Sequence, residues 1–384
     1  MLNQELIERE YGFLQDKIYV NTSLISMPPM RVQEAWKRYI QTYVDVCATN
    51  YPTYFPGLLE DARKELAKLL KAEPLEIAFT SSACASMTIL ANSFPFEKGD
   101  NVIITSEEHA SNAIPWLALE KRGITVKIVE SRGGCVYEED LIRAIDEHTR
   151  IMAVASVFFC TGFALDVAMV GKACKERGVY LAVDATQSLG RSRLYPKAEF
   201  VDFIAGGAHK GLLGTKSLGY LYCSKELCKK MKPYTGSLQS QGNGGRPFTL
   251  KHYDEIEWYP GAERFEAGNP PYGVIDALGK GVSLINEFGV ENIEAQIRET
   301  EEVLRGRLKG LPLRILEPER ERRSGMLFVF YPEGADLDQV REILVKNNVF
   351  ATVRYDYIRM TLHLYNSPKQ MGRLVETLEE ISRL

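Results

Sequence analysis

Two residues near the middle of the chain could do chemistry together, because each comes after a short apolar segment. Asp184 directly follows Tyr180–Val183 (YLAV), and Lys210 follows Phe203–Ala205, 26 residues after Asp184 in the chain. Apolar segments of this length are typical of strands buried in a parallel sheet. Ligands bind at the carboxyl ends of such strands, so we expect the carboxylate and the amine to meet at that edge.

An amine and a carboxylate placed in this way match the chemistry of pyridoxal phosphate (PLP). The Lys210 amine can form a Schiff base with the aldehyde of PLP, and the Asp184 carboxylate can pair with the pyridinium nitrogen. The protonated ring then accepts electron density when a bond at the substrate Cα breaks. Taken alone, the two residues are explained as well by a strand-end cap and an ordinary surface lysine.

Five stretches of sequence remove this ambiguity. Through them the chain resembles the class V aminotransferase and cysteine desulfurase family of fold type I PLP enzymes. Within this family it is most similar to the C–S lyase and isopenicillin-epimerase-like subgroup. The matching stretches are EHASNAIPW at 108–116, VDATQ at 183–187, HKGLLGTKSLGYLYC at 209–223, RFEAGNP at 264–270 and IRMTLHLYNS at 358–367.

The resemblance implies catalytic and cofactor-binding roles for five side chains. Lys210 would form the Schiff base and move the proton at Cα, while Asp184 would hold the pyridinium nitrogen. Gln187 would donate to the phenolic oxygen of the ring, and His209 would reach the phosphate. His109 would stack on the ring, with an ordinary histidine at the start of a helix as the alternative.

The resemblance also implies how the phosphate is held. Ala83 and Cys84 lie in the loop FTSSACAS before a predicted helix and would offer backbone N–H groups, as helix N-termini do. A reactive thiol at Cys84 is the weaker interpretation, because the family has Thr there. Asn269 stands where the family has a Thr that reaches the phosphate across a dimer interface. The resemblance therefore implies a homodimer with shared active sites, in which the GNGGRP loop at 242–247 also takes part.

Three further residues are assigned to substrate binding. Arg359 would bind the carboxylate of an amino acid substrate through a bidentate pair, with a structural ion pair as the alternative. Arg354 lies nearby in the segment TVRYDY and is a candidate for a second carboxylate on a larger substrate. Asn21 near the N-terminus is assigned to the substrate side as well.

Departures from the family pattern bear on the reaction. Gly207 replaces a family Ser, and Phe159 replaces an Asn that often touches the ring or substrate. A cysteine desulfurase needs a mobile Cys shortly before the carboxylate-binding Arg, yet no Cys follows Cys228. We therefore favour a C–S lyase type of β-elimination without a persulfide cysteine. Transamination and epimerisation of an amino acid are alternatives, and a non-catalytic PLP-fold scaffold is a remote one.

The elements around these residues predict an α/β fold. From about residue 60, short apolar strands alternate with amphipathic helices, which favours a mostly parallel sheet between helices. The segment Ser217–Cys223 (SLGYLYC) follows Phe203–Ala205 without a clear helix, which suggests an antiparallel strand. Together with the resemblance, this predicts a fold type I large domain with a seven-stranded sheet.

The rest of the chain predicts a smaller α+β domain. Residues 234–271 lack periodicity and suggest a loop over the site, and a long helical pattern then runs from 274 to 310. We expect an N-terminal arm at 1–20, a large PLP-binding domain at 21–270 and a small domain at 271–384. The small domain could also take in N-terminal residues.

Composition argues against several other classes of protein. The 47 basic and 51 acidic residues give a net charge of −4, so nucleic acid is not an expected partner. Metal-binding spacings such as CxxC are missing, and GLLGTKS at 211–217 lacks the Gly that a phosphate loop requires before its Lys. The apolar stretch at 151–170 is broken by polar residues and is interpreted as a buried strand, not a membrane span. Seven irregularly spaced cysteines and a charged N-terminus predict reduced thiols in the cytoplasm.

Overall fold

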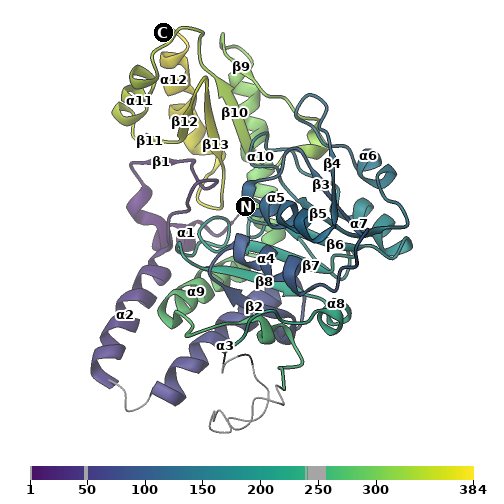
Figure 1. Ribbon diagram of the computed structural model, residues 1–384. Coiled ribbons are helices and arrows are strands. Elements are labelled where there is room, and N and C mark those ends of the chain that lie inside the picture. The colour runs from purple at the N-terminus through teal and green to yellow at the C-terminus, as the bar shows by residue number, and fades with distance from the viewer. Residues whose placement is uncertain (1, 47–50, 238–239, 241–256) are drawn as a thin grey trace.

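A seven-stranded sheet forms the centre of the protein, as the computed structural model shows for residues 2–46, 51–237, 240 and 257–384 (Figure 1). Its strands lie in the order β2-β8-β7-β6-β5-β3-β4, and only β8 runs antiparallel to its neighbours. This confirms the predicted seven-stranded, mostly parallel sheet with one antiparallel member. The strand bounds are β2 Ile77–Thr80, β3 Asn101–Thr105, β4 Thr125–Val129, β5 Thr149–Ala155, β6 Tyr180–Asp184, β7 Phe203–Gly207 and β8 Gly219–Cys223.

Both faces of this sheet are covered, because alternate residues of its strands enter two different hydrophobic cores. In β5, Ile151 and Ala153 face one core, and Met152 and Val154 face the other. The first core takes in the fully buried Trp116 and three helices: α4 (Ala83–Ser93), α5 (Ala110–Leu117) and α8 (Lys225–Lys230). The second core takes in α3 (Tyr51–Leu70), α6 (Glu138–Arg143), α7 (Val167–Glu176), α9 (Tyr272–Phe288) and α10 (Val290–Leu308).

A small antiparallel sheet carries the C-terminal part of the chain, at the top of Figure 1. Its strand order is β12-β13-β10-β9, and α11 and α12 pack together beside it. The N-terminal strand β1 pairs in parallel with β11, which places residues 18–19 beside this region. The bounds are β1 Ile18–Tyr19, β9 Arg314–Ile315, β10 Met326–Phe330, β11 Val349–Phe350, β12 Thr352–Arg354, β13 Tyr357–Thr361, α11 Leu337–Lys346 and α12 Met371–Ile381.

Two helices replace the long helix predicted over 274–310. The chain turns at Gly289, whose φ of +79° lies in the left-handed region that ends a helix, and α10 starts at the next residue. Of the two, α9 packs against α3 and against α2 (Met30–Val46), a helix that the sequence patterns did not assign. A short α1 (Gln4–Tyr11) precedes α2, and the domain boundary at 270/271 stays a prediction.

The apolar stretch at 151–170 forms most of β5 and the loop into α7, as predicted. Among the described residues, no helix has both the length and the apolar character that crossing a membrane requires. Of the predicted loop at 234–271, the GNGGRP segment lies outside the described residues.

The turn between α9 and α10 gives a stability prediction from two glycines. Changing Gly289→Ala forces a side chain into the left-handed region and should lower the free energy of unfolding by about 1 kcal/mol. Gly306 lies inside α10 with open space around its Cα, so Gly306→Ala should instead raise that free energy by about 0.5–1 kcal/mol. Urea unfolding of both variants checks this, and equal signs for the two would contradict the helix break.

Candidate functional site

A cavity of about 370 Å³ lies at the carboxyl ends of the parallel strands of the large sheet. It is bordered by residues that lie far apart in the chain, from Ser23 to Arg359. Nine of the eleven residues singled out from the sequence line it: Ala83, Cys84, His109, Asp184, Gln187, His209, Lys210, Arg354 and Arg359. The two that do not are Asn21 and Asn269.

The Lys210 amine lies in a largely buried place beside the Asp184 carboxylate. Asp184 is the last residue of β6, is 6% exposed, and accepts a hydrogen bond from the Thr186 backbone N–H at 2.9 Å. Burial lowers the pKa of Lys210 to about 8, with Asp184 opposing the shift and Arg359 adding to it. An appreciable fraction of this amine is therefore neutral near pH 7, as a nucleophile or a proton acceptor must be.

His109 lines the cavity from the position just before α5. Its Nδ1 accepts a hydrogen bond from the Ser111 backbone N–H at 3.1 Å, which fixes the ring as the N-cap of the helix. The edge of the ring also meets Phe159, with centroids 4.9 Å apart and planes at 82°. Burial and the nearby Lys210 lower the pKa of His109, which favours the neutral ring. A neutral flat ring suits stacking on a cofactor.

The other end of the cavity is built for an anion. The first-turn N–H groups of a helix have no intrahelical acceptors, and those of Ala83 and Cys84 in α4 border the cavity. Burial, Lys210 and Lys216 lower the pKa of His209 to about 4, so its ring can hydrogen-bond without carrying charge. Lys216, which sequence reasoning missed as a site residue, also lines the cavity.

These residues fit PLP. Among the described lining residues, Asp184 is the single carboxylate, and it lies close enough to Lys210 to affect the pKa of the amine. Gly207 leaves room beside His209, because a Cβ at this position would come within 3.0 Å of the His209 ring. Asp184 would hold the ring nitrogen, Lys210 the aldehyde carbon, and the α4 N-terminus with His209 the phosphate.

Two arginines enter the cavity from the small sheet. Arg359 in β13 is 5% exposed, and its Nη1 donates to the Phe159 carbonyl at 3.2 Å. Burial and the neighbouring Arg354 lower the pKa of Arg359. Within the described chain, neither arginine forms an ion pair with a carboxylate. Arg354 ends β12, next to Tyr355, which is 85% exposed.

The N-terminal segment reaches the cavity through residues that the sequence did not indicate. Ser23 and Leu24 line it, and the Ser23 carbonyl accepts a hydrogen bond from the Gln187 side chain at 3.3 Å. Asn21 lies just before them, and its Oδ1 accepts from the Thr352 hydroxyl at 2.5 Å. A role for Asn21 on the substrate side stays a prediction.

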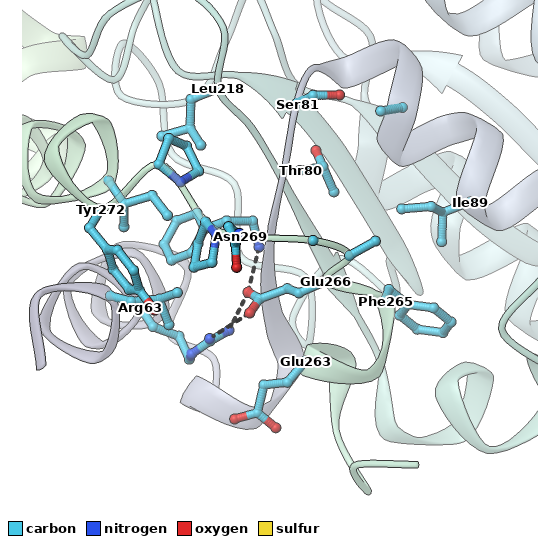
Figure 2. A pocket seen from close by; sticks show the side chains of 18 of the residues that line it. Arg63, Thr80, Ser81, Ile89, Leu218, Glu263, Phe265, Glu266, Asn269 and Tyr272 are labelled. Carbon is cyan, nitrogen blue, oxygen red and sulfur yellow. Dashed lines mark hydrogen bonds and ion pairs between the residues drawn. The ribbon is translucent and has the colours of Figure 1, made fainter. Parts of the chain in front are cut away.

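A second cavity of about 570 Å³ adjoins the first, and Figure 2 shows its lining. Asn269 lies here, and Ser81, Ser217 and Leu218 border both cavities. One wall is fixed by an ion pair in which Arg63 donates to both oxygens of Glu266, at 3.0 and 3.2 Å. Asn269 thus lines the second cavity and not the one that contains Lys210. Its role toward a partner subunit stays a prediction.

The described cysteines differ in their access to the site. Cys84 is the one that lines the cavity. Cys160 follows Phe159, but its thiol donates a hydrogen bond to the Glu107 carboxylate at 2.8 Å. Burial together with that carboxylate raises the pKa of the Cys160 thiol far above the usual value. Cys160 is therefore a poor nucleophile.

Comparison with known proteins agrees with this geometry. Residues 21–353 match the aminotransferase class-V family. Among similar sequences, a probable cysteine desulfurase from Methanothermobacter thermautotrophicus is 27% identical, over 99% of this chain and 98% of the relative. The uncharacterized aminotransferase YcbU from Bacillus subtilis is 26% identical, over 97% and 98%.

Solved structures show the same fold. Apo cysteine desulfurase from Thermococcus onnurineus superposes with a TM-score of 0.88 at 24% identity, covering 100% of this chain and 99% of that one. The cystine C–S lyase C-DES, in complex with its product cysteine persulfide, superposes with a TM-score of 0.87 at 20% identity, covering 97% and 100%.

The lowered pKa of Lys210 predicts how cofactor capture depends on pH. Only the neutral amine attacks an aldehyde, and its fraction rises as pH increases through the pKa of about 8. Below pH 8, the rate at which the cofactor-free protein captures PLP should rise about tenfold per pH unit and then level off near pH 9. Stopped-flow absorbance from pH 6 to 10 measures this. A rate that keeps rising to pH 10 would show an ordinary, exposed lysine.

Proposed function

Because the chain belongs to the aminotransferase class-V family of PLP-dependent enzymes, we propose that it acts on an amino acid. The proposed reaction is cleavage of a carbon–sulfur bond by β-elimination, without a persulfide on the protein. The observation that carries the proposal is the β12–β13 hairpin, which borders the cavity with Arg354 and leads into Arg359. This segment precedes the carboxylate-binding position, and it offers arginine and tyrosine in place of a sulfur-accepting cysteine.

Bound PLP supplies an electron sink for the charge released at the substrate Cα. The chain supports that sink with Asp184, whose buried carboxylate favours a protonated ring nitrogen. Gln187 lies close to Asp184, and its side-chain amide is held by the Ser23 carbonyl. Asp184 and Gln187 therefore present a carboxylate and an amide from one short, buried loop.

The proton at Cα is the task of Lys210. Its lowered pKa makes the released amine an effective acceptor near pH 8, and no other described lining residue is a lysine except the exposed Lys216. Arg359 would fix the substrate α-carboxylate through a bidentate pair, which orients the Cα–H bond toward the lysine. Phe159 and His109 both line the cavity, and their rings meet edge to face with centroids 4.9 Å apart, so they would border the substrate with aromatic surface.

Charge balance in the cavity favours a substrate with a second carboxylate. Arg359 matches one carboxylate, Lys216 lies near the phosphate end, and Arg354 is left without an anion in the described chain. A dicarboxylic disulfide such as cystine would place its distal carboxylate near Arg354. The C–S lyase whose structure superposes on this chain is named for cystine, which supports the proposal.

The enzyme is further proposed to act as a homodimer with shared sites. The position of Asn269 supports this, because the second cavity opens beside Ser81 and Ser217 at the phosphate end.

A second candidate function is cysteine desulfurase. Several of the similar sequences carry that name, and Cys84 lines the cavity, where its thiol could accept sulfur. The two functions differ in product, since β-elimination of cysteine gives pyruvate, ammonia and sulfide, whereas desulfuration gives alanine. Transamination would give a keto acid that keeps its side chain, and epimerisation would change only the configuration at Cα.

Product analysis tests the proposed reaction directly. Incubation with cysteine should yield pyruvate, ammonia and sulfide, and incubation with cystine should yield pyruvate, ammonia and cysteine persulfide. Neither should yield alanine, because no mobile cysteine takes up the sulfur. Cys84→Ser should keep turnover within about threefold, as should the control Cys160→Ser. Alanine as the main product, lost in Cys84→Ser alone, would establish the desulfurase instead. Keto acids with intact side chains would establish transamination.

Removing the charge of Asp184 tests the placement of the cofactor for every one of these reactions. Asp184→Asn leaves a buried protonated ring without its partner, so kcat should fall by roughly 10²–10⁴ while Lys210 still captures PLP. Asp202→Asn is the matched control, because Asp202 is also largely buried but bonds to the Leu181 N–H at the opposite end of the strands. Steady-state assays at saturating PLP measure both. Activity within about threefold in Asp184→Asn would overturn the placement.

A further inference from the structure

Arg191 is a buried arginine whose three donor nitrogens all meet backbone carbonyls. It is 3% exposed. Its Nη1 donates to the Gln187 carbonyl at 2.7 Å, its Nη2 to the Ser324 carbonyl at 2.6 Å, and its Nε to the Leu362 carbonyl at 2.9 Å. The planar guanidinium therefore joins three segments that are distant in sequence.

The three carbonyls belong to the two halves of the site. Gln187 lies in the loop that starts at Asp184, which holds the ring end of the cavity. Leu362 directly follows β13, three residues after Arg359, and Ser324 lies just before β10, the strand that pairs with β13. Arg191 thus connects the loop that faces the cofactor with the strand that carries the carboxylate-binding arginine.

No carboxylate neutralises Arg191 through a direct contact in the described part of the chain. The nearest acid that acts on it is Glu301, which is engaged by Arg305 at 2.8 Å and by the Gly325 N–H at 2.7 Å. Burial lowers the pKa of Arg191 to about 10, so it is still charged at pH 7. A buried cation compensated mainly by carbonyl oxygens holds those carbonyls in fixed positions, because losing any one leaves the charge poorly solvated.

A second contact, made by His363, also joins the end of β13 to a loop of the large domain. The ring Nε2 of His363, next to Leu362, is 2.9 Å from the carbonyl of Gly211, the residue after Lys210. The segment 362–363 is therefore bonded to both cofactor loops, once through Arg191 and once through His363.

We infer that Arg191 is a positioning residue, which sets the distance between the Asp184–Gln187 loop and the guanidinium of Arg359. The inference rests on the proposed function, in which Arg359 binds the substrate carboxylate. Arg191 touches neither substrate nor cofactor and acts through the β13 backbone. Its loss should loosen the grip on the carboxylate more than it slows the chemistry at Cα.

The test is the variant Arg191→Lys, in which a single ammonium replaces a guanidinium whose three nitrogens all donate hydrogen bonds. This keeps the charge but cannot reach all three carbonyls. In the PLP-loaded enzyme, the KM for the amino acid substrate should rise about tenfold, with kcat within threefold. Glycine, which has no side chain to eliminate, should show a similar rise of about tenfold in Kd when its binding is followed by cofactor absorbance.

Arg305→Lys is the matched control. Arg305 is 2% exposed, and it donates to the Leu316 carbonyl at 3.0 Å, but it contacts neither cofactor loop. Both lysine variants should lose a similar amount of thermal stability, while only Arg191→Lys should change the Kd for glycine. Equal changes in both, or none in Arg191→Lys, would overturn the positioning role. If Arg191→Lys does not fold, the same comparison is made with Arg191→Gln.

A third variant separates this inference from the proposed function. If Arg359→Lys leaves the Kd for glycine unchanged, Arg359 does not bind the carboxylate, and both the assignment and the role of Arg191 fail. If Arg359→Lys weakens glycine binding and Arg191→Lys does not, the positioning inference alone is overturned. Weaker binding in both, with less than additive effects in the double variant, supports it.

Discussion

The site depends on one constraint, which is that an amine and a carboxylate share a largely buried place. Lys210 lies just past β7, in the cavity at the carboxyl ends of the strands, and burial is the main cause of its lowered pKa. Asp184 opposes the shift and keeps the amine from losing its charge completely. A more open site would leave the lysine protonated, whereas a site without the carboxylate would not hold a charged ring nitrogen.

The parallel sheet makes this constraint simple to satisfy. Parallel strands end at the same edge, so residues such as Asp184 and Lys210 converge although 26 positions separate them. The helix that starts at Ala83 reaches the same edge, and its first residues border the cavity. The backbone of the large domain would therefore set where the ring, aldehyde and phosphate of PLP bind, and the small sheet adds Arg354 and Arg359 to the cavity lining.

Patterns in the sequence predict the parts of this protein that depend on local order. Apolar strands of four to seven residues, their terminal polar residues and the antiparallel strand near 219 are all visible in that way. The break at Gly289 is hidden, because its neighbours continue the helical periodicity on both sides. Ser23 and Arg191 are hidden for another reason. Ser23 accepts a hydrogen bond through its backbone carbonyl, and Arg191 donates to backbone carbonyls. Every residue has a backbone carbonyl, so the residue types do not reveal these contacts.

The threading of the N-terminal segment has a consequence for biosynthesis. The backbone of Val20 accepts from the Thr361 N–H at 2.7 Å, and the Ser26 N–H donates to the His209 carbonyl at 2.8 Å. Residues near position 20 are thus held by residues that the ribosome adds much later. A nascent chain that stops before β13 lacks both the Val20–Thr361 hydrogen bond and Arg359, so the pocket is incomplete until β13 has been made. Contacts across such long stretches of chain also favour slow folding.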